Sequence, residues 1–202
     1  MIEPFSLTGS VVQLVPLDRQ HVGALVVAAQ GERSTYDFTE VPSSSAHAAD
    51  YVDRLLADRD AGLVVPFAQR RLADGHLVGC TRFMELRWWH GRPHPDEVEI
   101  GGTWLATDAQ RTKVNTEAKL LLLHHAFDVW GVTRVALCTD ARNTRSRTAI
   151  ERIGARFEGV LRHHRPSHVA GERGRPRDSA MFAVTDDDWP FVAAELERRL
   201  EV

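Results

Sequence analysis

The sequence predicts an α/β fold in which helices flank a mixed central sheet. Stretches in which polar and apolar residues alternate, as in strands, are interspersed with runs typical of helices. No internal repeat or low-complexity linker divides the chain, and 202 residues suit one domain with a sizeable core. We therefore expect residues 1–202 to form a single domain.

The elements of the first half follow from periodicity and from capping and turn residues. Asp18 is a favoured helix N-cap, and Ala73-Asp74-Gly75 is a typical hairpin turn. Residues 31–45 show no strong periodicity, and we expect them to shape substrate specificity. The expected elements are strands at residues 11–17, 64–72 and 76–87 and helices at residues 18–29 and 45–60.

The segment 97–105 is expected to be a half-buried strand with an interruption. Acidic and apolar residues alternate in its first part, so Glu97 and Glu99 face one side of the sheet and Val98 faces the other. The pair Gly101-Gly102 follows, and glycine inside a strand permits a bulge or the close approach of another group. This pattern favours a strand that is partly unpaired.

A polar turn at residues 106–116 precedes a strongly helical run from Glu117 to Trp130, which Gly131 closes. The N–H groups and the positive dipole end of a helix N-terminus favour an anion, and Arg111 and Lys113 add charge suited to a pyrophosphate. Neither Walker-loop nor Gly-x-Gly-x-x-Gly spacing is present, which disfavours ATP and dinucleotides. The alternative is an ordinary capped helix with two solvated cations.

The last third continues the alternation of strands and helices. Residues 134–139 form a strand, and Asn143 opens a helix that ends at Gly154. A late strand is expected at residues 179–185, followed by a terminal helix at residues 186–200.

Basic residues are concentrated between the two last strands, in a stretch that contains Gly and Pro. We expect an exposed flexible loop there, with a substrate-side lid or a docking surface for an acidic partner as the alternative. The residues are Arg162, His163, His164, Arg165, His168, Arg173, Arg175 and Arg177.

Composition limits the function classes. The net charge of −3 gives no overall preference for nucleic acid. No apolar run approaches the roughly 20 residues of a membrane span and no leader-like segment is present, so a cytoplasmic protein is expected. Cys80 and Cys138 lie in strand-like runs and are expected to be buried thiols, and the histidines lack the spacing of a metal site. The pair Trp88-Trp89 indicates packing or a homodimer contact, with an acceptor pocket as the alternative.

This order of parts resembles the GCN5-related N-acetyltransferase (GNAT) superfamily, and most closely its RimJ/RimL-type branch, the ribosomal-protein-alanine N-acetyltransferase-like proteins. The resemblance extends from about residue 7 to about residue 200 and is most specific at residues 99–154. It implies a mostly antiparallel sheet that is splayed between its fourth and fifth strands. It also implies acetyl-CoA as the co-substrate, an amine as the acceptor, and no metal.

The resemblance assigns the coenzyme-binding residues. Gln110-x-x-Lys113-x-Asn115 takes the place of the family's Gln/Arg-x-x-Gly-x-Gly/Ala loop, so both glycines are absent and a positive φ at Lys113 would carry strain. Lys113 is expected to add charge near the phosphates, and Asn143 to bind the pantetheine arm, to cap its helix, or both. The implied loop residues are Gln110, Arg111, Thr112, Lys113, Val114, Asn115 and Thr116, and the strand residues that pair with the arm are Trp104, Leu105 and Ala106.

Acetyl transfer needs a neutral amine, stabilisation of an oxyanion and a proton for the leaving thiolate. Glu99 is the preferred base, directly or through a water, because like charge from Glu97 or partial burial would make one of the two carboxylates more basic. Many relatives place a donor Tyr where this chain has Ile150. Ser146 lies one helical turn earlier and is the preferred acid.

The preferred acceptor is a protein N-terminal α-amine, because a modest base suffices for it. The alternatives are acetylation of a small amine or antibiotic and a CoA-binding module without transferase activity. A nucleic-acid binder that uses the basic segment is a weaker alternative.

Overall fold

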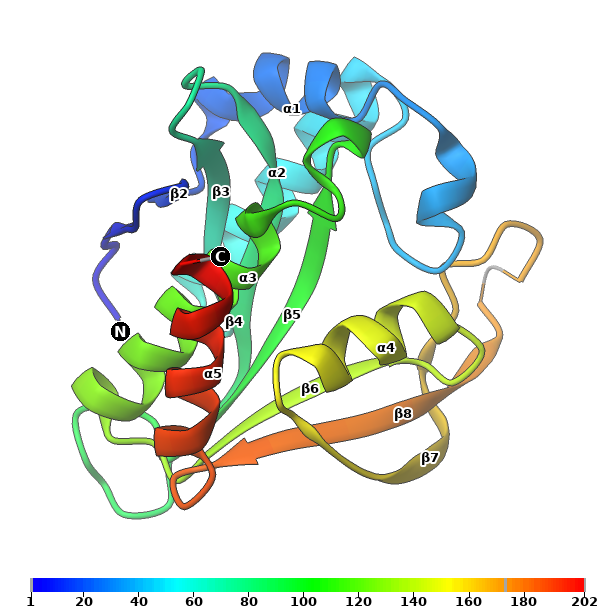
Figure 1. Cartoon of the computed structure of the whole chain (residues 1–202). Helices are drawn as coiled ribbons and strands as arrows, with labels where there is room; N and C mark the ends of the chain where they lie inside the picture. Colours follow the sequence, from blue (N-terminus) through cyan, green and yellow to red (C-terminus); the bar gives the residue numbers. More distant parts are fainter. Residues whose placement is uncertain (1, 173, 202) are drawn as a thin grey trace.

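The computed structural model describes residues 2–172 and 174–201. At its centre is an eight-stranded sheet in the order β1-β2-β3-β4-β5-β6-β8-β7 (Figure 1). Neighbouring strands are antiparallel except β5 and β6, which are parallel, so the prediction of a mixed, mostly antiparallel sheet is confirmed. The strands are β1 (Leu7–Thr8), β2 (Val12–Pro16), β3 (Val65–Arg71), β4 (Leu77–Arg87), β5 (Glu97–Leu105), β6 (Arg134–Asp140), β7 (Arg156–Pro166) and β8 (Pro176–Thr185).

Helices cover both faces of the sheet. In Figure 1, α3, α4 and α5 lie in front of it and α2 lies behind it. The helices are α1 (Val22–Ala28), α2 (Ser45–Asp60), α3 (Lys113–His124), α4 (Thr144–Arg152) and α5 (Trp189–Glu201), with short 3₁₀ segments η1 (Arg19–His21), η2 (Arg33–Tyr36) and η3 (Thr107–Ala109) and a π-helical segment η4 (His125–Trp130). In the described part of the chain, no helix combines the length and the apolar character that crossing a membrane requires.

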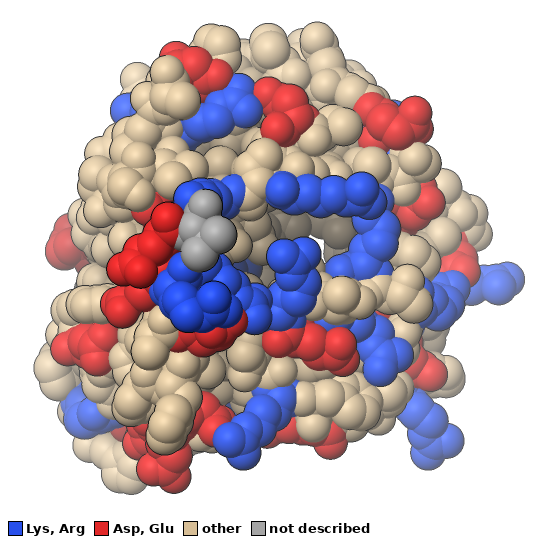
Figure 2. Space-filling view, in the orientation of Figure 1, with Lys and Arg blue, Asp and Glu red and all other residues tan. Residues whose placement is uncertain are grey.

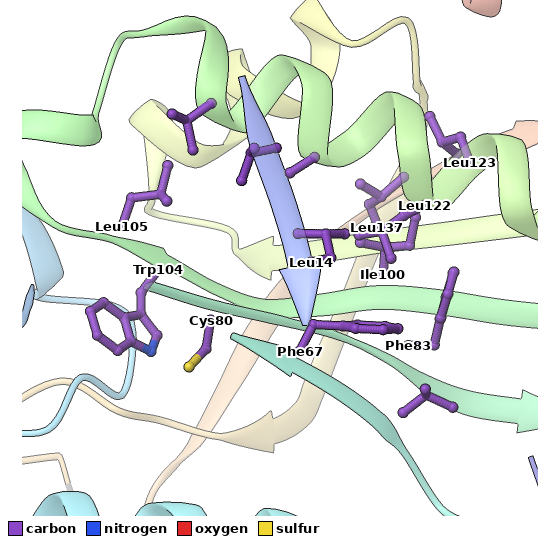
Figure 3. Close-up of a cluster of buried hydrophobic side chains, with 14 of the residues drawn as sticks. Leu14, Phe67, Cys80, Phe83, Ile100, Trp104, Leu105, Leu122, Leu123 and Leu137 are labelled. Atoms are coloured by element: carbon purple, nitrogen blue, oxygen red, sulfur yellow. The ribbon is translucent and has the colours of Figure 1, made fainter. Parts of the chain in front are cut away.

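The core lies between the sheet and the helices. Figure 3 shows side chains from β2, β3 and β4 packed against others from β5, β6 and α3. Burying one such side chain typically contributes about 1.5–3 kcal/mol, so this cluster fixes α3 firmly on the sheet. Its members include Leu14, Phe67, Phe83, Ile100, Leu122, Leu123 and Leu137, all at most 2% exposed.

The two halves of the sheet separate between β5 and β6. These strands pair only from Glu97 opposite Arg134 to Glu99 opposite Ala136. Beyond that point β6 continues along β8, while β5 continues along β4 as far as Leu105. The predicted splay is therefore confirmed, and it leaves a gap whose floor is near Glu99.

The two glycines of β5 allow close approach, as predicted. The register of β4 and β5 shifts between Cys80 and Arg82, and Gly102 has a φ of +56°. A Cβ at Gly102 would overlap the guanidinium of Arg82, so the space is already filled. At Gly101 a Cβ would lie 2.7 Å from the sulfur of Met84 and 3.1 Å from a carboxylate oxygen of Glu99.

Helix α3 begins four residues earlier than the predicted start at Glu117. Thr112 is the N-cap, because its hydroxyl accepts a hydrogen bond from the backbone N–H of Val114 at 3.3 Å. Lys113 is therefore already helical, and the residue with positive φ is Arg111, at +61°. The strain that a positive φ at Lys113 would carry is therefore avoided, since the chain reverses at Arg111, before the helix begins.

Glu117, the expected first residue of the helical run, lies in the second turn of α3 and binds the start of β2. Its carboxylate, 4% exposed, accepts hydrogen bonds from Ser10, Val11 and Val12 at 2.7–2.8 Å. A Cβ at Gly9 would overlap this carboxylate. The contact joins α3 to the start of β2.

The basic segment is mostly a hairpin rather than a loop. Strands β7 and β8 extend through Arg165 and Arg177, which lie opposite each other, and only residues 167–175 connect them. Arg173, which was assigned to this segment, lies outside the described residues. The prediction of one exposed loop is wrong because β7 and β8 pair with each other as far as Pro166 and Pro176.

Candidate active site

A cavity of about 820 Å³ occupies the gap where β5 leaves β6. It extends from the N-terminus of α3, past α4, to the hairpin of β7 and β8 and to the segment before α2. Figure 2 shows Lys and Arg side chains around this central hollow. The predicted site residues on its wall are Glu99, Trp104, Leu105, Gln110, Arg111, Thr112, Asn115, Thr116, Asn143 and Ser146.

Four predicted site residues do not line this cavity. The Lys113 ammonium donates to the carbonyl of Leu200 in α5 at 2.9 Å, and its expected contribution of charge near the phosphates stays a prediction. Ala106 and Val114 are buried in the core, although the Val114 amide belongs to the first turn of α3. The Glu97 carboxylate lies 3.5 Å from Arg134 and lines a separate hollow.

The α3 end of the cavity is suited to an anion. The first turn of α3 contributes Asn115 and Thr116 to its wall, where Arg111 and Arg145 also lie. Gln110 fixes the geometry, because its amide donates to the carbonyl of Leu105 at 3.0 Å and to the hydroxyl of Thr35 at 3.2 Å, and its oxygen accepts from Arg145 at 3.0 Å. One side chain thus joins the end of β5 to α4.

Glu99 lies at the floor of the cavity and is 3% exposed. Its two oxygens accept hydrogen bonds from Arg165 at 2.7 and 2.8 Å. Glu97 is paired with Arg134 instead, so each carboxylate has its own guanidinium. The predicted like-charge repulsion between Glu97 and Glu99 is therefore replaced by two ion pairs.

Asn143 and Ser146 open α4 beside the cavity. The side-chain oxygen of Asn143 accepts from the Ser146 N–H at 3.0 Å, which confirms the predicted N-cap. Ser146 is half-buried on the cavity wall, and Ile150 lies one turn further along the same face. The cap uses only the oxygen of Asn143 and leaves its amide N–H groups available.

Two tyrosines on the wall had no signal in the sequence. The Tyr36 hydroxyl donates to the carbonyl of Leu105 at 2.9 Å, which fixes the end of β5. Tyr51 of α2 lines the opposite wall, and burial raises the pKa of its phenol, so it stays protonated. Both lie in or next to segments without catalytic motifs, and only the tertiary fold brings them to the cavity.

Lys119 of α3 is a further residue that the sequence did not single out. It is 6% exposed and lines the cavity, and its ammonium donates to Thr103 at 2.7 Å and to Thr81 at 3.4 Å. No acidic partner lies within salt-bridge distance among the described residues, and burial lowers the pKa of Lys119 to about 7.

The cysteines are free thiols, and Cys80 is buried while Cys138 is half-buried. Burial raises the pKa of Cys80 to about 12 and, together with the charge of Glu99, that of Cys138 to about 11. Protonated thiols are poor nucleophiles, as expected. Within residues 2–172 and 174–201, no three His, Cys, Asp or Glu side chains are grouped to hold a metal ion.

The aromatic pair Trp88 and Trp89 follows β4 and does not line the cavity. The two side chains are 44% and 55% exposed. Their loop is held by Asp96, which accepts from the Trp89 N–H at 2.6 Å. This placement contradicts the acceptor-pocket alternative, and a dimer contact stays a prediction.

Comparison with known proteins finds relatives along most of the chain. Residues 12–156 match the family described as "Acetyltransferase (GNAT) domain". A curated protein of Bacillus subtilis (strain 168), "Putative ribosomal N-acetyltransferase YdaF", is 30% identical over 152 residues, which cover 74% of this chain and 73% of that protein.

Solved structures of acetyltransferases also match this chain. A GCN5-related N-acetyltransferase from Brucella melitensis matches with a TM-score of 0.83 and 29% identity, over 98% of this chain and 86% of that chain. The RimJ of Mycobacterium smegmatis in complex with CoA-disulfide matches with a TM-score of 0.75 over 98% of this chain and 93% of that chain. At 20% identity, that second match shows a common fold.

Proposed function

The chain belongs to the GCN5-related N-acetyltransferase superfamily, and we propose that this N-acetyltransferase transfers the acetyl group of acetyl-CoA to a primary amine. The observation that carries the proposal is the cavity between β5 and β6, with a helix N-terminus at one end and a buried carboxylate at the other. It has room for an extended coenzyme arm and an amine.

The residues at the α3 end fit a diphosphate. In this proposal the first-turn amides of α3 and the side chains of Arg111 and Arg145 hold the charged linker. Backbone groups at Trp104 and Leu105 and the free amide N–H groups of Asn143 hold the pantetheine arm. Lys113 and Asn115 replace glycines without obstruction, because both are helical.

The chemistry needs one proton removed and one supplied. Acetyl-CoA supplies an activated thioester carbonyl. The neutral amine attacks the carbonyl, the new C–N bond replaces the C–S bond, Glu99 takes the proton that the amine nitrogen loses, and Ser146 gives a proton to the departing thiolate and regains one from solvent. A carboxylate is a modest base, and a modest base suits an α-amine better than the more basic lysine side chain.

The preferred acceptor is an N-terminal α-amine, which agrees with the ribosomal N-acetyltransferase name of the Bacillus subtilis relative. A small amine is the alternative within the same chemistry. The half-enclosed cavity and the nearby segment 34–40 limit the acceptor to a short chain end or a compact molecule.

Two measurements test the proposal. Calorimetry should detect binding of acetyl-CoA, and thiol release should depend on added amine. Glu99→Gln should lower kcat about 100-fold, which is typical of losing a general base, while Glu151→Gln on the outer face of α4 should leave it unchanged. No affinity for acetyl-CoA would refute the transferase, whereas affinity without turnover on any amine would indicate a CoA-binding module.

A further inference from the structure

The part of the cavity wall that faces α2 carries positive charge that the described residues do not neutralise. Arg82 and Arg177 both line the cavity. Among residues 2–172 and 174–201, neither forms a salt bridge, and the Nε atom of each is buried without a hydrogen-bond partner. The Nη2 atom of Arg177 donates a weak hydrogen bond to the sulfur of Cys138, at 3.9 Å. A buried donor without a partner is costly, so these groups are suited to a ligand.

The Arg82 side chain lies on the face of β4 that is turned toward α2. Its neighbour Thr81 faces α3, where its hydroxyl accepts from Lys119. Successive side chains of a strand alternate, so Arg82 faces α2, where its charge acts on Tyr51. The guanidinium lies over the bulge at Gly102, which only a residue without a side chain permits.

Arg177 stands directly opposite Arg165 on the neighbouring strand. Like charges in this arrangement repel each other. Glu99 and Glu85 neutralise Arg165. Asp140 also interacts electrostatically with Arg177, but its carboxylate forms a salt bridge with Arg142 at 2.8 Å. The charge of Arg177 thus remains uncompensated close to Glu99.

The remaining titratable groups on this side do not neutralise the two arginines. Burial lowers the pKa of His168; the charge of Glu40 opposes this, and the charges of Arg177 and Arg82 add to it. His168 is therefore neutral at pH 7 and lies near both guanidinium groups. The Glu40 carboxylate is held by Arg54 at 2.6 Å.

We propose that Arg82 and Arg177 bind an anionic group of the acceptor, a carboxylate or a phosphate, while the acceptor's amine lies beside Glu99. The proposal rests on the proposed function and narrows it to one class, amines that carry an acidic group a few bonds away. Guanidinium forks recognise both anions by charge-assisted hydrogen bonds. The acidic group anchors the acceptor and aims its amine at the floor of the cavity.

Acceptor pairs in which one member carries an acidic group and the other does not test this, with rates compared per neutral amine. The pairs are the C-terminally amidated dipeptides Ala-Glu and Ala-Gln, alanine and alaninamide, and phosphoethanolamine and ethanolamine. The wild type should show a kcat/KM at least about tenfold higher for the anionic member of one or more pairs, as expected for a charge-assisted hydrogen bond. The pair with the largest ratio distinguishes a side-chain carboxylate, an α-carboxylate and a phosphate.

Variants connect the preference to the two arginines. Arg177→Gln and Arg82→Gln should each bring the ratio close to one, and Arg82→Lys should restore part of it. Arg19→Gln, on the surface of η1, should change neither rate nor ratio. A preference that survives both Gln variants would refute the assignment to these residues.

Different experimental results would refute this inference and the proposed function. Turnover of all pairs at equal rates would overturn the anion site and leave the transferase intact. No turnover of any acceptor would contradict the transferase, and calorimetry of both dipeptides in the presence of CoA then decides. A higher affinity for the acidic dipeptide would support the site, whereas equal affinities or no binding would refute it.

Discussion

Replacing Lys119 by Met should stabilise the protein, and the gain should depend on pH. The side chain lies between α3 and β5 without an acidic partner among the described residues, and it is 6% exposed. Met has a similar length and flexibility and keeps the packing of the aliphatic stem. The hydroxyls of Thr81 and Thr103 lie 2.8 Å apart and bond each other, so the substitution leaves neither without a partner.

The magnitude follows from the pKa of Lys119, which burial lowers from 10.5 to about 7. At about 1.4 kcal/mol per pKa unit, this corresponds to about 5 kcal/mol of unfavourable free energy below pH 7. Between pH 7 and 10.5 the unfolded chain binds more protons than the folded one, so wild-type stability rises with pH in this window. The Met variant lacks this rise.

Urea unfolding followed by tryptophan fluorescence at about pH 6 and about pH 9.5 measures the effect. The free energy of unfolding of Lys119→Met should exceed that of the wild type by about 3 kcal/mol more at the lower pH. By pH 9.5 the wild type has regained most of the stability that it loses when the buried ammonium is charged. The loss of two hydrogen bonds lowers the advantage by a similar amount at both pH values and cancels in this comparison.

The chain offers a matched control, because Lys113 is its only other lysine. It lies on the same helix and is exposed, with its ammonium on the Leu200 carbonyl. Lys113→Met should show no pH-dependent advantage. If the Lys119→Met advantage were the same at both pH values, or larger at the higher one, the ammonium would not be desolvated and the reasoning would be wrong.

Three further predictions concern the cavity and its supports. Ser146→Ala should lower kcat about 100-fold and Tyr51→Phe less than about threefold if Ser146 supplies the proton; the reverse ranking in steady-state assays would make Tyr51 the donor. Glu117→Gln should lower the free energy of unfolding in urea by about 2 kcal/mol near neutral pH. Burial opposes ionisation of Glu117, but the hydrogen-bond donors at residues 10–12 outweigh it and lower the pKa of this carboxyl. The difference from the wild type should therefore shrink as the pH falls below 4.5, and a difference that stays constant would contradict this. Arg111→Gly should stabilise the fold by about 1 kcal/mol by relieving the positive φ yet weaken acetyl-CoA binding in calorimetry. Lys113→Gly should instead cost up to about 1 kcal/mol, because Lys113 is already the first residue of a helix; opposite signs would place the strain at Lys113.

The sequence predicted the elements better than the contacts among them. Strand β5 and helix α2 have the predicted bounds, because alternation and a Ser cap are local signals. The sequence predicts too late a start for α3, because no apolar periodicity marks the first turn after the Thr112 cap. The pairing of Glu99 with Arg165 joins residues 66 positions apart, and no local pattern could indicate it.

The same limit explains which site residues were missed. Arg82, Lys119 and Tyr51 are unremarkable in their own elements, and they matter because the separation of β5 and β6 opens a cavity between them. The cap at Asn143 was predictable, because Asn before a helix is a local signal. The backbone groups that the resemblance assigns to the pantetheine arm stay a prediction, and the resemblance gave no information on the acceptor wall.

The absent glycines of the coenzyme loop follow from where the chain reverses direction. A turn that needs left-handed backbone at its fourth residue requires Gly there, but in this chain the left-handed residue is Arg111 and the helix begins two positions later. Lys113 and Asn115 therefore take ordinary helical conformations, and their amides remain at the N-terminus of α3. The strain is moved to a residue whose guanidinium stands on the cavity wall, where a bound anion can offset about 1 kcal/mol of backbone cost through a charge-assisted hydrogen bond. A loop without glycines can therefore still be suited to a diphosphate, because Arg111 takes the left-handed backbone conformation that a glycine would otherwise provide.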